Sequence, residues 1–383
     1  MSSSGFSLKD QLFNPGKVQG LARDLQRADP AFDASAFTAE ATAGLAAREL
    51  KARIDWICSC LQRHLPADYP QAVALILKAL PPPLDPTRTD DDFGDFIYTP
   101  YGEYIARYGC QAQHLDLSLD ALHSLTRRFS VEGPIRVFLK AFPAQTLARL
   151  RQWQHDSNYH VRRLVSEGTR PRLPWYLRLD LPLSETLPLL ETLHADKTRF
   201  VTRSVANHLN DISKTDPDTV LATLQHWQQL KRQQPAELTY ITRHSLRSLI
   251  KQGYAGALQL LGYGQTPQLA QLQLQAMQQT LSIGDTLHFS LNLQAQPEAP
   301  PQHLLIDYWI DFQRAGNTPG RKVFKWKQLV LQPGQALQLE KRHAFKPMRT
   351  RRLWPGVHRL GLQVNGQAGP EIDFTLCSER SDS

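Results

Sequence analysis

The blocks Val161-Arg162-Arg163-Leu164-Val165, Val201-Thr202-Arg203-Ser204-Val205 and Ile241-Thr242-Arg243-His244-Ser245 recur at an interval of 40 residues. The third residue of each block is arginine, and each block follows another helical pattern of similar length. A fixed period of about 40 to 47 residues with two helices per unit is typical of HEAT-like arrays. The sequence therefore predicts helix pairs that stack into a curved solenoid with one concave binding face.

Arg163, Arg203 and Arg243 recur along one surface of such a solenoid. A row of cations suits a periodic polyanion, and the obvious one is nucleic acid. The chain carries a net charge of +8, and the excess is local. Basic residues outnumber acidic ones by 7 over residues 101–260 and by 9 over residues 301–360, whereas acidic residues are in excess by 3 over residues 1–100.

The hydrophobic pattern changes once along the chain. It has helical spacing up to about residue 263 and then alternates with period two after Gly262-Tyr263-Gly264. Three groups of alternating residues predict strand faces: Leu287, Phe289, Leu291 and Leu293; Ile306, Tyr308, Ile310 and Phe312; and His358, Leu360, Leu362 and Val364. We therefore expect an all-α HEAT-like domain over residues 1–264 and an all-β, antiparallel Ig-like sandwich over residues 266–380.

The cysteines and the apolar runs constrain the cellular setting. The spacing of Cys58, Cys60, Cys110 and Cys377 fits no zinc or haem pattern, so we expect free thiols in a reducing compartment. The N-terminus lacks the layout of a signal peptide, and no run approaches the roughly 18 apolar residues that span a bilayer. We expect a cytoplasmic protein.

Carboxylates accompany the arginines in three successive units. Arg163 and Glu167 are four residues apart on one predicted helix, as are Arg128 and Glu132. The third group comprises Arg203, Asn207 and Asp211, and a loop with Arg170, Arg172 and Trp175 follows the helix that carries Arg163. These residues are either ordinary ion pairs with a core tryptophan or a site that handles positive charge, because carboxylates weaken a pure phosphate-binding surface.

Two further groups are open to two interpretations. Tyr98 and Tyr101 belong to an aromatic stretch that either packs a helix onto the array or offers stacking surfaces to bases. The second group comprises basic residues of the predicted sandwich, among them Lys322, Lys325, Arg351 and Arg352. They either bind a DNA duplex or form a soluble basic surface, with the tryptophans of the region in the sandwich core.

The string Arg162 to Trp175, RRLVSEGTRPRLPW, resembles the signature of AlkC-type DNA alkylation repair glycosylases. These HEAT-like repeat enzymes belong to the AlkC/AlkD superfamily. The resemblance extends over most of the chain and includes residues 7–14, 90–104, 127–136 and 203–212. The region with Lys322-Val323-Phe324-Lys325 and Thr350-Arg351-Arg352 is similar to the Ig-like extension that many members carry.

The resemblance implies excision of the N3-alkylated bases 3-methyladenine and 3-methylcytosine from double-stranded DNA during base excision repair. By matching position, Glu132, Trp175 and Asp211 are the candidate catalytic residues, with Arg163 and Glu167 in support. We expect a monofunctional enzyme, because no lysine is placed for a lyase step. The resemblance further implies a bacterial-type protein that is associated with the nucleoid and needs no metal and no organic cofactor, and we assume a monomer. The expected DNA and substrate contacts are Arg163, Glu167, Arg170, Arg172, Arg203, Asn207, Arg243, Tyr98, Tyr101, Lys322, Lys325, Arg351 and Arg352.

The chemistry of such a substrate defines what these residues have to do. An N3-alkylated base is cationic and leaves as a neutral molecule, so it needs no general acid. Glu132 or Asp211 would stabilise the charge that develops on the sugar and accept a proton from water. Trp175 would lie against the sugar or the base.

Two other functions compete with this hypothesis. A non-catalytic HEAT-like scaffold that binds nucleic acid or protein keeps the arginine row and uses the carboxylates as ion pairs. An RNA-directed module predicts dependence on the 2′-hydroxyl group. A sequence-specific DNA regulator is disfavoured, because the sequence has no recognition-helix motif and no dimerisation heptads.

Overall fold

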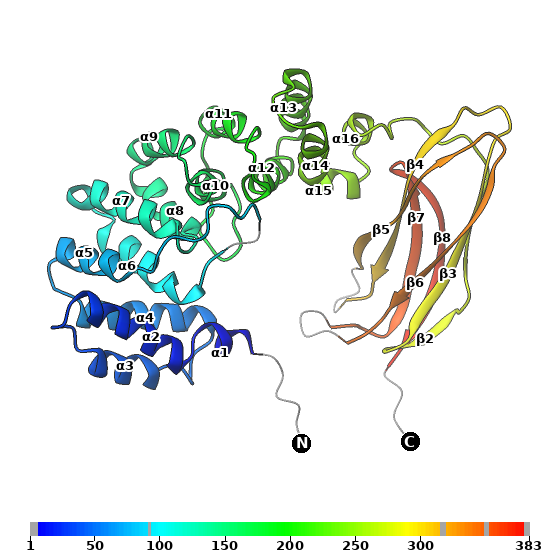
Figure 1. The fold of residues 1–383 in the computed structure, drawn as a ribbon. Helices are drawn as coiled ribbons and strands as arrows, with labels where there is room; N and C mark the ends of the chain where they lie inside the picture. Colours follow the sequence, from blue (N-terminus) through cyan, green and yellow to red (C-terminus); the bar gives the residue numbers. More distant parts are fainter. Residues whose placement is uncertain (1–6, 91–92, 315–318, 348–351, 379–383) are drawn as a thin grey trace. The chain divides into compact units, whose positions relative to one another are not determined.

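A computed structural model describes residues 7–90, 93–314, 319–347 and 352–378. Helices α1 (Leu8–Leu12) to α16 (Ala255–Leu260) precede strands β1 (Leu269–Ala276) to β8 (Gln367–Cys377), as Figure 1 shows. The predicted order of an all-α region and an all-β region is confirmed. The chain forms two compact units, residues 1–212 with 230–245 and residues 213–229 with 246–383.

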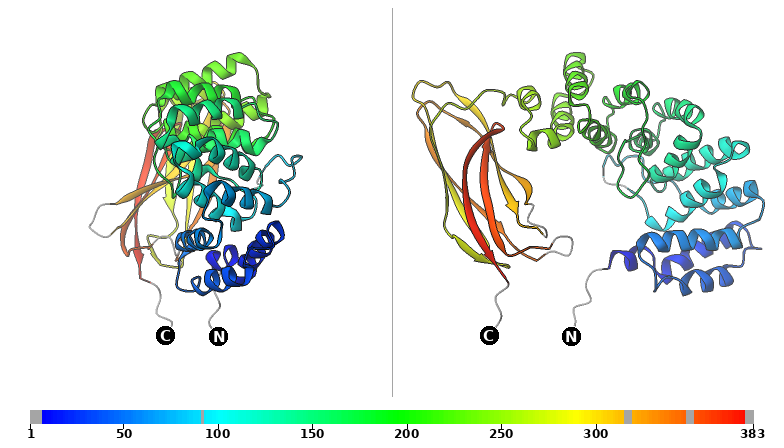
Figure 2. Two further views of the ribbon diagram at one scale, coloured as in Figure 1. Left: turned by 90° about the vertical axis from the view of Figure 1, so that its left-hand side faces the viewer. Right: turned by 180° about the vertical axis from the view of Figure 1, so that it is seen from behind.

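The first unit contains two rows of helices. In one row each helix packs on the next: α4 (Leu50–His64), α6 (Thr99–Gly109), α8 (Glu132–Ala141), α10 (Tyr159–Gly168), α12 (Arg199–Ile212) and α14 (Pro235–Ser245). The other row comprises α5 (Tyr69–Ala79), α7 (Leu115–Thr126), α9 (Pro143–Trp153) and α11 (Leu183–Leu193). At the N-terminal end, α2 (Pro15–Ala28) and α3 (Ala34–Ala43) pack together. Figure 2 shows the same succession from behind.

The 40-residue period places equivalent residues on neighbouring helices of the first row. Arg163 lies on α10, Arg203 on α12 and Arg243 on α14. Amphipathic spacing fixes the rotation of these helices: on α12, for example, Val201 and Val205 are completely buried. Short polar residues start the helices, as at α10, where the side chain of Asn158 accepts a hydrogen bond from the amide of His160 at 2.9 Å.

Between α5 and the short helix η1 (Phe96–Tyr98) runs a segment that we call the strap, residues 84–90 and 93–95. The amide of Leu84 donates to the carbonyl of Arg127 at 2.9 Å, and the carbonyl of Thr89 accepts from the amide of Phe200 at 3.0 Å. Gly94 forms a β-bridge with Phe129 at a φ of +77°, where a Cβ atom would lie 1.9 Å from a backbone oxygen. The strap therefore joins the N-terminal helices to the start of α12.

A second irregular segment, the tryptophan loop (residues 169–182), connects α10 to α11. The completely buried side chain of Arg136, on α8, holds this loop. Its guanidinium donates to the carbonyls of Gly168 at 3.0 Å, Arg170 at 2.7 Å and Leu177 at 2.8 Å. Burial lowers the pKa of Arg136 to about 10, with a smaller contribution from the charge of Arg170.

The second unit contains an antiparallel sheet with the strand order β1-β3-β6 and a larger sheet with the order β2-β8-β7-β4-β5. Their bounds are β2 (Thr280–Ser282), β3 (Thr286–Ala295), β4 (Gln302–Phe312), β5 (Gly320–Leu331), β6 (Ala336–Ala344) and β7 (Gly356–Val364). All three predicted strand faces are buried in one core between the sheets. The short strand β2 departs from the antiparallel expectation because it pairs with β8 in parallel.

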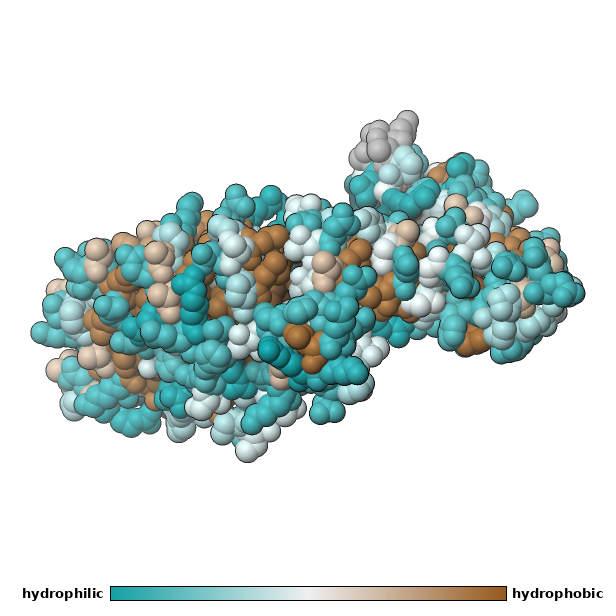
Figure 3. All heavy atoms as spheres, turned by 90° about the horizontal axis from the view of Figure 1, so that it is seen from above, coloured by the Kyte–Doolittle hydropathy of each residue, from teal (hydrophilic) through white to brown (hydrophobic). Residues whose placement is uncertain are grey.

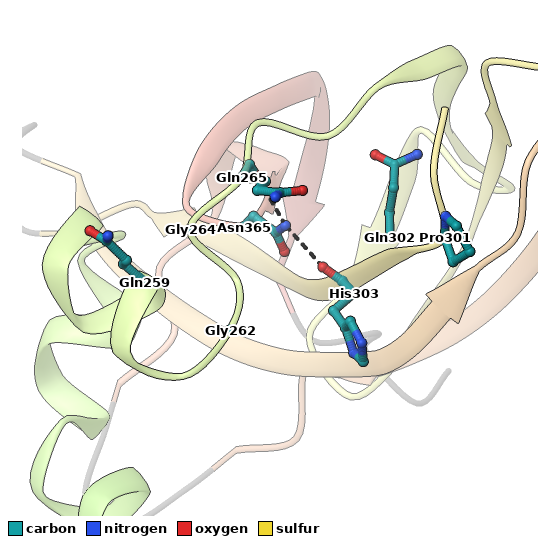
Figure 4. A pocket seen from close by; sticks show the side chains of 8 residues that line it. All are labelled: Gln259, Gly262, Gly264, Gln265, Pro301, Gln302, His303 and Asn365. Atoms are coloured by element: carbon teal, nitrogen blue, oxygen red, sulfur yellow. Dashed lines mark hydrogen bonds between the residues drawn. The ribbon is translucent and has the colours of Figure 1, made fainter. Parts of the chain in front are cut away.

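The second unit also includes α13 (Pro217–Leu230), α15 (Arg247–Lys251) and α16. The side-chain amide of Asn365 ties the segment after α16 to the sandwich, because it donates to the carbonyls of Gln265 at 3.2 Å and His303 at 3.0 Å (Figure 4). The hollow drawn there has a volume of about 550 Å³, and amides make up much of its wall. The domain boundary at residue 264 stays a prediction.

Two surface properties complete the description. Hydrophilic side chains cover much of the face shown in Figure 3, and apolar ones lie between them in separate areas. Within the described ranges, no helix combines the length and the apolar character needed to cross a membrane.

Replacing Arg136 by methionine tests the role of this buried guanidinium. The substitution leaves several buried carbonyls without donors, so we expect the free energy of unfolding to fall by about 3–5 kcal/mol. Urea denaturation followed by the far-ultraviolet helix signal measures the change. The exposed Arg178→Met is the matched control, and equal stability of the two variants would contradict this role.

Candidate active site

The first unit has a cavity of about 330 Å³ where the strap and the tryptophan loop meet α8, α10 and α12. Its walls combine charged side chains with aromatic rings, which are Phe93, Phe96, Phe129, Trp175, Tyr176 and Phe200. The residues come from segments that lie up to about 110 positions apart in the sequence. The fold therefore assembles the site from several repeats.

Glu132 is the first residue of α8 and reaches the cavity with one side of its carboxylate engaged. The hydroxyl of Ser130 donates to Glu132 Oε2, and Arg163 Nη1 lies 3.5 Å from the same oxygen. No hydrogen bond to Glu132 Oε1 is found among the described residues. A free carboxylate oxygen at a cavity wall can accept a hydrogen bond from a ligand or from water.

Tyr176 lies beside Glu132 because Gly133 leaves room for its ring. A Cβ atom at Gly133 would come within 1.9 Å of that ring, so any larger residue would displace it. Burial raises the pKa of Tyr176, and the negative charges of Glu132 and Glu103 raise it further. The phenol therefore stays protonated at neutral pH.

Glu167, Arg170 and Asp211 form a buried ion-pair network. Arg170 Nη1 donates to Glu167 Oε1 at 2.5 Å, and Arg170 Nη2 lies 2.8 Å from Asp211 Oδ2. The hydroxyl of Ser204 donates to Glu167 Oε2 at 2.6 Å. Burial opposes the charge on Glu167, but Arg163 and Arg170 outweigh it and lower the pKa of this carboxyl. Glu167 is therefore a fixed negative charge in the wall.

His208 packs behind this network and is completely buried. Burial lowers its pKa to about 4, and the charge of Arg170 acts in the same direction. Nδ1 lies 3.1 Å from the carbonyl of Ser166, whereas Nε2 has no hydrogen-bond partner among the described residues. The neutral imidazole thus donates from Nδ1 and adds no positive charge next to Arg170.

Trp175 lies at the edge of the cavity with 65% of its surface exposed. Its φ of 73° is in the left-handed region, which bulky residues rarely adopt. The ammonium of Lys51 donates to its carbonyl at 2.7 Å, and Arg136 holds the loop on both sides. A strained and exposed indole that is anchored through its backbone is typical of a functional position.

The predicted arginine row does not form a uniform phosphate-binding surface. Arg163 is 6% exposed, and its guanidinium lies 4.4 Å from the Phe200 ring and 3.8 Å from Glu167. Arg203 also lines the cavity and pairs with Asp90 of the strap. The expectation that Arg163 holds a phosphate is therefore wrong, because its charge is buried and balanced by carboxylates. Arg243 is partly exposed on α14, and its phosphate contact stays a prediction.

One of the two ion pairs predicted from the sequence forms in the structure, and the other does not. The pair of Arg163 and Glu167 is confirmed, whereas the predicted pair of Arg128 and Glu132 is wrong. Helix α7 ends before Arg128 and α8 begins at Glu132, so the two residues do not share a helix. Arg128 instead donates to the carbonyl of Pro81 at 3.0 Å.

Three of the other predicted contact residues line the cavity, namely Glu167, Arg170 and Asn207. Glu167 and Arg170 are buried in its wall, so only a group that enters the cavity can contact them. Arg172 is exposed on the tryptophan loop outside the cavity. Asp211 is 4% exposed and does not line the cavity.

The two predicted aromatic residues differ in burial. Tyr101 is completely buried in the packing of α6, which excludes it as a stacking surface. Tyr98 is partly buried and does not line the cavity, so its contact with DNA stays a prediction. The rings found there instead were missed, because Phe93, Phe129 and Phe200 belong to three separate segments. Their positions next to Gly94, Ser130 and Arg199 gave no local signal.

The basic residues of the sandwich lie largely on the edge strand β5 and near β7. Lys322 and Lys325 are exposed, and the guanidinium of Arg352 lies 4.2 Å from the Trp354 ring. Arg351 lies outside the described residues. A hollow of about 520 Å³ is lined by Arg314, Arg321, Lys322 and Arg352 together with Trp354. Trp326 packs against the sandwich core, as the alternative interpretation expected.

The four cysteines are free thiols, as expected. In the described ranges no three His, Cys, Asp or Glu side chains are grouped so that they could hold a metal ion.

The pKa of His208 predicts a pH dependence of stability. Its unfolded value is about 6.5, so the unfolded chain gains a proton first as the pH falls. The contribution of His208 to the free energy of unfolding is fully present above pH 6.5. It is lost as the pH falls from 6.5 through 4. We expect His208→Asn to reduce the loss of unfolding free energy between pH 6.5 and pH 5 by about 2 kcal/mol.

Urea denaturation at the two pH values measures this difference. The exposed His155→Asn is the control and should behave as the native protein. An unchanged pH dependence in His208→Asn would show that this imidazole is not buried in its neutral form.

Comparison with known proteins agrees with this architecture. Residues 130–247 match the family model described as DNA alkylation repair enzyme, and residues 270–378 match that of the YhaZ C-terminal Ig-like domain. A Bacillus subtilis (strain 168) protein with the name "Uncharacterized protein YhaZ" is 31% identical over 331 residues, which are 86% of this chain and 87% of the relative.

A solved structure is similar over nearly the whole length. It is the alkylpurine DNA glycosylase AlkC of Pseudomonas fluorescens bound to DNA containing an abasic site analog. The TM-score is 0.86 at 34% identity, and the similarity covers 97% of this chain and 99% of that one. Two family models, a curated relative and a solved structure thus agree on both parts of the chain. This chain belongs to the AlkC-type DNA alkylation repair family, with HEAT-like helical repeats followed by an Ig-like domain.

Proposed function

We propose that this protein is a monofunctional DNA glycosylase that removes cationic N3-alkylated bases, 3-methyladenine and 3-methylcytosine, from double-stranded DNA. The observation that carries the proposal is the cavity beside Trp175, where the carboxylate of Glu132 faces a space walled by aromatic rings. Membership in the family and the likeness to an alkylpurine DNA glycosylase support it.

The charges of the cavity suit a cationic substrate. Three arginines line the cavity, and together they pair with four carboxylates, so the net charge of the whole group is negative. Arg163 pairs with Glu132 and Glu167, Arg170 with Glu167 and with Asp211 behind the wall, and Arg203 with Asp90. Aromatic faces attract cations, and a water-poor cavity strengthens such interactions. An alkylated base, or the sugar cation that forms as it leaves, is stabilised in these surroundings.

The reaction needs one activated water molecule. As the bond between C1′ and the base nitrogen breaks, its electron pair neutralises the positive charge of the leaving base. The oxygen of water bonds to C1′, and its proton passes to Glu132 Oε1. Glu132 therefore acts both as an electrostatic partner of the sugar cation and as a general base. The products are a neutral free base and an abasic site.

The remaining roles follow from burial. Asp211 is held by Arg170 at the back of the network, so it acts by keeping Glu167 and Arg170 in place. The exposed indole of Trp175 lies against the sugar or the base of the bound strand. Phosphate contacts come from cations such as the exposed Arg172 and the partly exposed Arg243, and such contacts carry no sequence information.

Glu132→Gln tests the proposed chemistry. The amide cannot accept the proton from water, so we expect release of free methylated base to fall by about 10²- to 10⁴-fold. Binding to DNA with an abasic site analogue should change little. The assay measures free 3-methyladenine and 3-methylcytosine after incubation with DNA treated with a methylating agent.

The matched control is Glu49→Gln, which changes an exposed carboxylate outside the cavity and should leave base release intact. Absence of release by the native protein, under conditions in which it binds the DNA, would refute the proposed function. It would favour a non-catalytic DNA-binding scaffold.

The sandwich is proposed to contribute phosphate contacts through Lys322 and Lys325. We expect the double variant Lys322→Ala/Lys325→Ala to bind DNA more weakly, with the slope of log K against log salt concentration reduced by about 2. Titrations at several salt concentrations measure the slope. Lys78→Ala, an exposed lysine of α5, is the control. An unchanged slope in the double variant would exclude these phosphate contacts.

A further inference from the structure

Ser130 lies between the two charged groups at the front of the cavity. Arg163 Nη1 donates to Ser130 Oγ at 2.6 Å. A serine hydroxyl has a single proton, and the oxygen that accepts from Arg163 directs this proton to its other neighbour. That neighbour is Glu132 Oε2. The three side chains therefore form a hydrogen-bond chain: Arg163 donates to Ser130, and Ser130 donates to Glu132.

The hydroxyl of Ser130 does not cap the helix that follows it. It precedes α8, where a serine commonly caps the helix by accepting from a backbone amide. At this helix the N-cap residue is Val131, and no side chain caps it. The hydrogen bonds of Ser130 go to Arg163 and Glu132 instead, both of which line the cavity.

We infer that Ser130 is a positioning residue that holds Glu132 in its reactive orientation. This inference rests on the proposed function of Glu132 as the general base. The direct contact of Arg163 with Glu132 is longer, at 3.5 Å, so the hydroxyl provides the shorter link between the two charges. Because Oε2 is engaged by Ser130, Oε1 is the oxygen presented to water.

The link also explains how Arg163 can lie beside the reactive carboxylate while its direct contact with Glu132 stays at 3.5 Å. Arg163 is stacked 4.4 Å from the Phe200 ring and shares its charge with Glu167. An N–H of Nη1 polarises Ser130, and hydrogen bonds to a charged acceptor are stronger than neutral ones. Orientation of a general base to within a fraction of an ångström has a large effect on rate.

Ser130→Ala removes the hydroxyl and leaves Arg163 and Glu132 in place. We expect the single-turnover rate of base release at saturating enzyme to fall about 10- to 100-fold, as for loss of a hydrogen bond to a charged group. The enzyme concentration that gives half the maximal rate should stay within about twofold. A purely structural defect would instead lower the melting temperature and weaken DNA binding.

The conservative variant gives a second readout. Ser130→Thr keeps the hydroxyl and should restore most of the single-turnover rate. Ser59→Ala, a partly buried serine of α4 away from the cavity, is the matched control.

The outcomes separate this inference from the proposed function. Absence of base release by the native protein would overturn both. A native protein that is active beside an equally active Ser130→Ala would overturn the role of Ser130 alone, and Glu132 would stay the base. A Ser130→Thr variant as slow as Ser130→Ala would also overturn it, because the hydroxyl would then not be the group that sets the rate.

Discussion

The buried guanidinium of Arg136 organises the site. It has no ion-pair partner among the described residues, and it donates hydrogen bonds to carbonyls at the start of and within the tryptophan loop. Those carbonyls would otherwise be buried without donors, since the loop folds back onto α8. Trp175 and Tyr176 are carried by the same loop, and Arg170 enters its network from there. One side chain of α8 thereby places residues that the solenoid helices alone could not position.

The charges of the cavity form two connected groups. At the front, Arg163 and Ser130 act on one oxygen of Glu132; at the back, Arg170 joins Glu167 to Asp211. Buried charges are costly unless they are paired and hydrogen-bonded, so each arginine stabilises the carboxylates that surround it. His208 stays neutral behind Arg170, because a second buried cation next to this arginine would be unfavourable. The arrangement leaves Glu132 as the carboxylate with a free oxygen towards the cavity.

Several predictions from the sequence hold because they depend on local patterns. The 40-residue period and the change to alternation after residue 263 predicted both architectures, and the three strand faces are buried as expected. The resemblance of residues 127–136 and 162–175 pointed to Glu132 and Trp175, which line the cavity. Sequence spacing failed where the contacts cross between repeats. It predicted a partner for Glu132 four residues away, whereas the actual partner Arg163 lies on the next helix of the row.

The sequence by itself determined the helix pairs, the sandwich and the family, because hydrophobic period and motif strings are local properties of the chain. The tertiary structure alone decided which polar groups are buried and which way they face. It turned Arg163 from an expected phosphate contact into a buried partner of carboxylates and placed Tyr101 in the core. It also brought Phe93 and Phe200 to one wall. The physical reason is that burial and pairing depend on distances between segments remote in sequence, and no local pattern encodes those distances.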